Sequence, residues 1–261
     1  MKVGLKLWST NVDGYLQEAR RLYAERVFDY LELFVVPGSE SLLDCWKRLH
    51  GECGIPFVVH NAHAAVGFNL ADAAAERRNR AIYAQTKLFA DALGAAHVIF
   101  HGGMDGAPEE TARQLRQLGE PRALLENKPF LPLPNPRGLK RCRCATAEEI
   151  GYVLAETGCG FCLDVGHAVC SAHSQKREAY AYVEELFRRY RPAMLHLSDV
   201  AAIDSPYDSH EHLGTGQLDF CKLGEVLPLT AAPVSLETRK SFADRLDDFA
   251  ADVAFMRRMY A

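Results

Sequence analysis

Short apolar runs alternate with amphipathic segments along the whole chain. Most of the runs are rich in β-branched or aromatic residues, which is typical of parallel strands that are buried on both faces. They predict strands at residues 3–7, 30–35, 57–59, 97–100, 123–125, 161–163, 193–197 and 234–236. The amphipathic segments predict helices at residues 15–24, 72–93, 111–118, 147–156, 179–190 and 247–259.

Strands that alternate with helices form the repeat of an α/β barrel, and eight of them predict the (β/α)8 TIM barrel. The length of 261 residues agrees with this fold, which typically needs about 250. No linker rich in glycine and serine divides the sequence, so residues 1–261 are expected to form a single domain. Two long loops expected at 128–144 and 198–219 both follow strands, which assigns them to the active-site face.

Side chains of the kinds that bind metals recur where the predicted strands end or just beyond. A single histidine at a strand end is more often a structural residue, but the same context repeated along the chain favours a shared site. All strands of a parallel barrel point their carboxyl ends to one face, so these side chains are expected to converge there. The predicted ligands are His60, His101, Glu126, Asp164, His167, His196, Asp208, His210 and Glu237.

The mixture of imidazole and carboxylate groups favours Zn²⁺, Mn²⁺ or iron over the metals of a thiolate site. Asp164 and His167 lie three positions apart, where a strand is expected to turn into a loop. Asp208 and His210 lie two positions apart, which in an extended loop places both side chains on one side. Each pair can chelate one ion, so the pattern predicts a multinuclear metal site.

The ligand order resembles that of the xylose-isomerase-like TIM-barrel superfamily, and within it the endonuclease IV (AP endonuclease family 2) pattern. The order includes the run Asp208-x-His210-x-x-Leu-Gly-x-Gly and extends over nearly the whole chain. The resemblance implies a hydrolase with two or three zinc ions, which activate water for attack on a phosphoester. It implies one ion at His60, His101 and Glu126, a second at Glu126, Asp164, His196 and Glu237, and a third at His167, Asp208 and His210.

Two segments depart from the family that cleaves DNA. A bulky Tyr-Leu pair, which in that family wedges into the duplex, is replaced here by His63 and Ala64. The basic loop after the second strand is replaced by the acidic sequence VVPGSESLLD. We therefore expect a small-molecule substrate, anionic or sugar-like, and do not expect duplex DNA to be cleaved efficiently.

Four further residues are candidates for contacts with such a substrate. Alternation along the first strand points Lys6 into the barrel near its mouth, where it binds either a substrate anion or a barrel carboxylate. Lys128 and Arg239 follow the strands of two predicted ligands and can clamp a phosphate, although loop cations are most often simply solvated. His63 is expected to contact the substrate or to hydrogen-bond a ligand.

A second reaction class remains open. One manganese-like ion held by Glu126, Asp164, His196 and Glu237 would suit a sugar isomerase or epimerase, with Glu126 and Glu237 moving the proton from opposite faces. These two glutamates are thus the expected catalytic residues. The two classes differ in whether the other five predicted ligands also carry metal. A metal-stabilised binding protein is disfavoured, because structural zinc sites are closed and small.

Composition narrows the class of protein further. The net charge of −4 gives no bulk positive field of the kind that nucleic-acid binders show. No apolar run is long enough for a membrane span, and the first residues read as a strand rather than a signal peptide. Eight cysteines then predict reduced thiols and a cytoplasmic protein. Cys159 and Cys162 lie in a predicted strand and are read as structural, whereas Cys142 and Cys144 lie in an expected loop, where they can be exposed.

Overall fold

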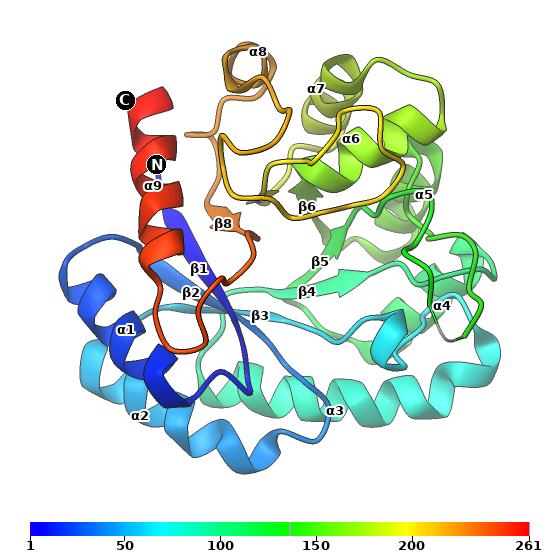
Figure 1. Ribbon diagram of the computed structural model, residues 1–261. Helices are drawn as coiled ribbons and strands as arrows, with labels where there is room; N and C mark the ends of the chain where they lie inside the picture. Colours follow the sequence, from blue (N-terminus) through cyan, green and yellow to red (C-terminus); the bar gives the residue numbers. More distant parts are fainter. Residues whose placement is uncertain (136, 261) are drawn as a thin grey trace.

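The computed structural model describes residues 1–135 and 137–260. Pro136, in the predicted loop 128–144, and Ala261, at the end of the predicted domain, lie outside these residues. The described strands form a closed barrel in chain order, in which every strand runs parallel to its neighbours and β1 pairs with β8 (Figure 1). They are β1 (Val3–Trp8), β2 (Tyr30–Phe34), β3 (Phe57–His60), β4 (Val98–His101), β5 (Ala123–Glu126), β6 (Gly160–Asp164), β7 (Met194–Leu197) and β8 (Val234–Leu236). The predicted TIM barrel is confirmed.

Helices pack around the outside of the barrel (Figure 1). They are α1 (Asp13–Ala24), α2 (Leu43–Cys53), α3 (Glu76–Ala92), α4 (Pro108–Leu118), α5 (Ala147–Thr157), α6 (Val165–Ser174), α7 (Ala179–Tyr190), α8 (Phe220–Val226) and α9 (Asp247–Met259). Three short 3₁₀ turns, Glu40–Leu42, Ala64–Val66 and Ala73–Ala75, lie in the connecting segments. Every predicted helix is present, and α2, α6 and α8 are additional to the prediction. None of the described helices is long and apolar enough to cross a membrane.

The start of α6 corrects one expectation. The pair Asp164 and His167 lies at the first turn of a helix and not in a loop, because Asp164 caps the helix. Its carboxylate accepts a hydrogen bond from the backbone N–H of His167 at 2.6 Å, which satisfies a donor that the helix itself leaves free. A side chain that ends a strand therefore also fixes the direction of the following helix.

The inside of the barrel is built in two layers. The lower layer is mainly apolar and contains Tyr30, Val58, Ile99, Leu124, Cys162 and Met194. Gly4 belongs to the same level, where a Cβ would lie 2.4 Å from the Tyr30 ring and 2.7 Å from the Ser235 hydroxyl. Only glycine leaves room for this tyrosine, whose hydroxyl lies 3.0 Å from that of Ser235. The lower layer closes the barrel beneath the mouth.

The two cysteines of the loop between β5 and α5 are not exposed, contrary to the expectation from the sequence. Cys142 and Cys144 are both buried, because the loop returns to the barrel and Cys142 forms an isolated antiparallel bridge with Met104. Burial raises the pKa of the Cys142 thiol to about 11. These thiols are packing groups, as is Cys162 in the lower layer.

Candidate metal centre

The upper layer of the barrel is ionisable throughout. Side chains alternate in direction along a strand, so the residue two positions after each lower-layer residue points to the same interior. The strand register agrees, with Lys6 opposite Glu32, His101 opposite Glu126 and Asp164 opposite His196. Each strand thus delivers one charged or ligating side chain to the mouth: Lys6, Glu32, His60, His101, Glu126, Asp164, His196 and Glu237.

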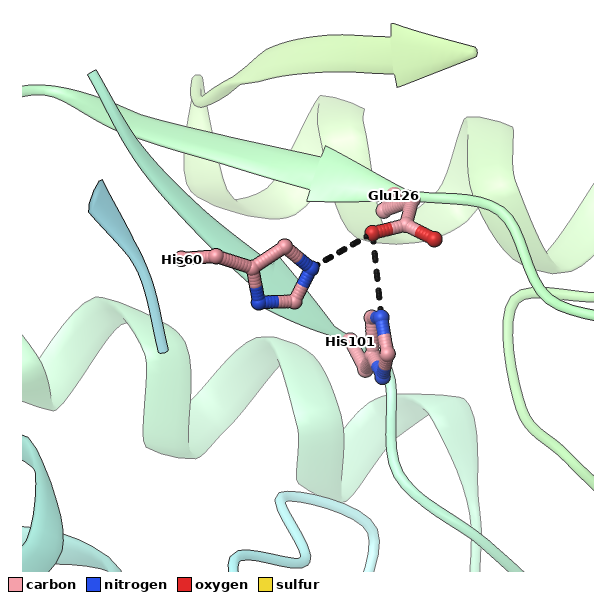
Figure 2. A group of neighbouring side chains, drawn as sticks. All are labelled: His60, His101 and Glu126. Carbon is pink, nitrogen blue, oxygen red and sulfur yellow. Dashed lines mark hydrogen bonds and ion pairs between the residues drawn. The ribbon is translucent and has the colours of Figure 1, made fainter. Parts of the chain in front are cut away.

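The first group consists of His60, His101 and Glu126, which are all buried. One carboxylate oxygen of Glu126 faces both rings, as Figure 2 shows, at 2.9 Å from His60 Nε2 and 3.0 Å from His101 Nε2. The other ring nitrogen of His60, Nδ1, lies 2.7 Å from the Asn61 carbonyl oxygen. When Nδ1–H of His60 donates to this carbonyl oxygen, Nε2 carries the free lone pair and points toward the Glu126 oxygen, as a metal ligand would.

The second group shares Glu126 with the first and adds Asp164, His196 and Glu237. His196 lies at its centre and is fully buried. Its Nδ1 is 2.6 Å from a Glu237 oxygen, 3.6 Å from Glu126 and 4.0 Å from Asp164. Three carboxylates therefore surround one ring nitrogen.

The third group is formed by His167, Asp208 and His210. One oxygen of Asp208 lies between the two rings, 3.2 Å from His167 Nε2 and 2.6 Å from His210 Nε2. His167 Nδ1 faces the carbonyl oxygen of Asn127 at 2.9 Å. The structure thus brings all nine predicted ligands into three adjoining groups, and within each group the candidate ligand atoms lie within 4.8 Å of one another.

The arrangement fits bound cations. Several ligand-type atoms are buried without a hydrogen-bond partner among the described residues: Asp164 Oδ2, Asp208 Oδ1 and His210 Nδ1. Buried polar atoms normally have partners, and converging carboxylates repel one another in a low-dielectric interior. A positive ion between these atoms would satisfy both requirements, and imidazole with carboxylate is a donor set that zinc, manganese and iron accept.

Glu32 also belongs to the candidate site, although the sequence pattern did not predict it. It is fully buried in β2, and its two oxygens face His196 Nε2 at 3.0 Å and Lys6 Nζ at 3.1 Å. Burial opposes its charge, but His196 and Lys6 outweigh burial and lower the pKa of Glu32 to about 2. As an anionic acceptor it orients the His196 ring, so that Nδ1 points at the carboxylates.

The candidate substrate contacts have different surroundings. Lys6 Nζ lies between Glu32 and Glu237. Burial alone would lower the pKa of Lys6, but these carboxylates raise it above its usual value. Lys128 Nζ is 3.0 Å from His167 Nε2. Thus Lys6 has the carboxylate partners considered in the sequence analysis and also lines the cavity at the mouth.

His63 and Arg239 complete the set of candidates. The His63 ring stacks beside that of His101, with ring centres 5.8 Å apart. Burial lowers the pKa of His63 to about 3, so the ring is neutral near pH 7. Arg239 is largely exposed and pairs with Glu211 at 2.8 Å. All four candidates line one cavity of about 400 Å³ over the metal-type groups.

The third group depends on the loop between β7 and α8, which carries Asp208 and His210. Asp199 organises this loop from a fully buried position. Its carboxylate accepts hydrogen bonds from the backbone N–H groups of Val200, Gly214, Gly216 and Leu218 at 2.8–2.9 Å. One buried carboxylate therefore fixes both ends of the segment that carries two of the nine predicted ligands.

Comparison with known proteins agrees with this fold. Residues 21–259 match the family model described as a xylose isomerase-like TIM barrel. The probable endonuclease 4 of Mycobacterium leprae is 30% identical over 203 residues, covering 75% of this chain and 76% of the relative. That of Mycobacterium tuberculosis is 30% identical over 201 residues, with the same coverage.

Solved structures resemble the whole barrel. Endonuclease IV from Thermus thermophilus superimposes with a TM-score of 0.72 and 22% identity, covering 99% of this chain and 100% of that one. A D-tagatose 3-epimerase-like protein also gives a TM-score of 0.72, at 19% identity and with coverage of 100% and 97%. At these identities the structures show a shared fold. The family model and the mycobacterial relatives go further: the chain belongs to the xylose isomerase-like TIM-barrel family.

Proposed function

We propose that the protein is a divalent-metal-dependent phosphoester hydrolase that acts on a small sugar- or phosphate-containing substrate. The main support is that nine buried or half-buried side chains of the metal-binding kind form three groups, two of which share Glu126. A single-metal enzyme does not need ligand sets beyond its own. We propose two or three ions per chain, zinc in the first place, with manganese or iron as alternatives.

The residues that would hold the ions follow from the three groups. One ion would lie at His60, His101 and Glu126, one at Glu126, Asp164, His196 and Glu237, and one at His167, Asp208 and His210. Ions bound there would polarise a phosphoryl oxygen and lower the pKa of water. The chain itself supplies Lys6 to hold Glu237 in place, and Lys128 and Arg239 to attract the anionic ester.

A small substrate is supported by the cavity and by its walls. A volume of about 400 Å³ lies within the range of small-ligand sites, which is roughly 300–1,000 Å³. Relatives named endonuclease 4 support hydrolysis of a phosphoester. His63 and Ala64, in place of a bulky wedge, favour a small molecule over duplex DNA.

A sugar epimerase is the second candidate. Its support is the second group, since Glu126, Asp164, His196 and Glu237 form a complete four-ligand set by themselves. Structural neighbours include a D-tagatose 3-epimerase-like protein and an L-ribulose 3-epimerase. In this reading Glu126 and Glu237 would exchange protons with the substrate, and the third group would be a polar lining of the cavity.

Asp208→Ala separates the two candidates, with Asp204→Ala as the control from the same loop. In the hydrolase, Asp208→Ala should remove about one ion per chain and lower turnover by roughly 100-fold or more, because a lost Lewis acid costs several kcal/mol. Metal content by elemental analysis and phosphate release from a panel of sugar phosphates measure both effects. Unchanged metal content together with retained turnover would reject the hydrolase and favour the epimerase.

A further inference from the structure

The cations that line the cavity differ in whether they have a partner. Lys6 contacts two carboxylates, and Arg239 pairs with Glu211. Lys240 lines the same cavity, but within the described part of the chain it forms no ion pair. Its ammonium donates a hydrogen bond only to the nearby carbonyl oxygen of Thr238, at 2.7 Å. Like Lys128, whose ammonium contacts the ring of His167, Lys240 is therefore a cavity cation with unused capacity for an anion.

The surroundings of Lys240 disfavour a bare charge. Burial lowers the pKa of Lys240 to about 8, although the carboxylates of Asp248 and Asp252 act in the opposite direction. A partly buried ammonium without a paired anion is costly, and a paired one is not. An anionic group of a ligand would supply the partner that residues 1–135 and 137–260 do not provide.

Thr238 gives a second and independent observation. Its side chain is 5% exposed and lines the same cavity. Among the described residues its hydroxyl oxygen has no hydrogen-bond partner, which is unusual for a buried hydroxyl. A hydroxyl and an ammonium that line one cavity form a donor pair that suits a carboxylate or phosphate oxygen.

The adjoining wall of the cavity favours a ring in the substrate. Strand β1 is the neighbour of β8, and Trp8, at its end, lines the cavity beside Phe34, with ring centres 5.6 Å apart. Trp8 remains 55% exposed, which is high for so large an apolar side chain. An exposed aromatic face inside the cavity is suited to the apolar face of a sugar or to a planar ring.

We propose that Lys240 and Thr238 form a subsite for a second anionic group of the substrate. The substrate class is then a small phosphoester that carries a carboxylate or a further phosphate away from the reacting ester. This inference rests on the proposed hydrolase, which assigns the reacting phosphoryl group to the metal ions. It adds the feature by which the enzyme would distinguish its substrate from simple phosphate esters.

Matched phosphonates test the subsite without catalysis. Calorimetric titration of the zinc-loaded protein would use alkylphosphonates, ω-phosphonocarboxylates and bisphosphonates, with two to six carbons between the ends. For at least one chain length, the compound with the second anion should bind about tenfold or more tightly than the alkylphosphonate of the same length. The reason is that hydrogen bonds to charged groups are stronger than those to neutral groups. The gain should disappear in Lys240→Met, shrink in Thr238→Val and persist in the surface control Lys222→Met. If the ω-phosphonocarboxylates gain more affinity than the bisphosphonates, the second anion is a carboxylate; the reverse result indicates a phosphate.

The alkylphosphonates keep the two hypotheses apart. If they bind and the second anion adds nothing at any length, the subsite is wrong and the phosphoester site stands. If no phosphonate binds the metal-loaded protein, the proposed hydrolase is wrong, and the subsite falls with it. Should Lys240→Met lose alkylphosphonate binding through misfolding, Thr238→Val decides, since an unchanged gain in that variant would overturn the subsite.

Discussion

Glu32→Gln tests whether the Glu32 carboxylate sets the metal affinity of the candidate metal centre by orienting His196. In the wild-type protein His196 Nε2 lies 3.0 Å from a carboxylate oxygen of Glu32. The amide of glutamine keeps the size of the side chain and an oxygen that can accept the same hydrogen bond. It removes the negative charge that also faces Lys6 at 3.1 Å. The change therefore weakens the orientation of His196 without emptying any ligand position.

The expected loss follows from these two contacts. A charged acceptor contributes about 1.5–3 kcal/mol to a hydrogen bond and a neutral one about 0.5–1.5 kcal/mol, so the His196 contact alone predicts roughly a tenfold effect. Lys6 is left with Glu237 as its carboxylate partner and competes with the metal for that ligand. We expect affinity for the ion at His196 to fall by about 10- to 100-fold, the range of such outer-shell changes.

Competition with a chromophoric chelator measures the affinity of each bound ion. Glu120→Gln is the matched control, because Glu120 is also a buried glutamate but pairs with Arg122 and Tyr83 away from the centre. The ion at His167, Asp208 and His210 should keep its affinity in both variants. Equal affinities for all ions in Glu32→Gln and wild type would refute the orienting role of Glu32.

Three other predictions can be checked with standard assays. Interactions with Arg122 and Tyr83 outweigh burial and lower the pKa of Glu120 from 4.5 to about 2. Its stabilisation, at most about 3 kcal/mol, should be complete above pH 4.5 and disappear as the pH falls towards 2, so urea unfolding of Glu120→Gln and wild type should converge in acid. With metal supplied, an abasic duplex should be cleaved far below about 10 s⁻¹, the median enzyme turnover, because His63 and Ala64 form no wedge. Turnover near that value would contradict this. Chelation should lower the melting temperature, since the bound ions stabilise only the folded state, and an unchanged value would argue against bound metal.

The sequence predicts the barrel well because each strand is a compact apolar run that ends at a polar residue. The same feature explains why Glu32 was missed. It lies within the run YLELF rather than after it, and the strand continues for two residues beyond it. The usable signal was the two-residue period from Tyr30, which places Glu32 on the same interior face.

The three unpredicted helices have separate physical causes. Helix α6 is buried at Val165–Ala172, so its sequence lacks the polar stripe by which an amphipathic helix is recognised. Helix α8 has only seven residues, and α2 follows directly on the 3₁₀ turn Glu40–Leu42, within the sequence expected to be an acidic loop. The burial of Cys142 and Cys144 depends on a long loop that packs back on the barrel, which no local pattern encodes.

The loop held by Asp199 makes the three proposed ion positions differ in how rigidly their ligands are held. Two of them take their ligands from strand ends inside a rigid barrel, whereas the third needs a segment that is ordered by four backbone N–H groups on one carboxylate. Filling that position must therefore contribute to loop closure. An ion at His167, Asp208 and His210 should therefore be the first to leave when metal is scarce. Its loss should expose residues 200–218 to proteases before any other part of the barrel.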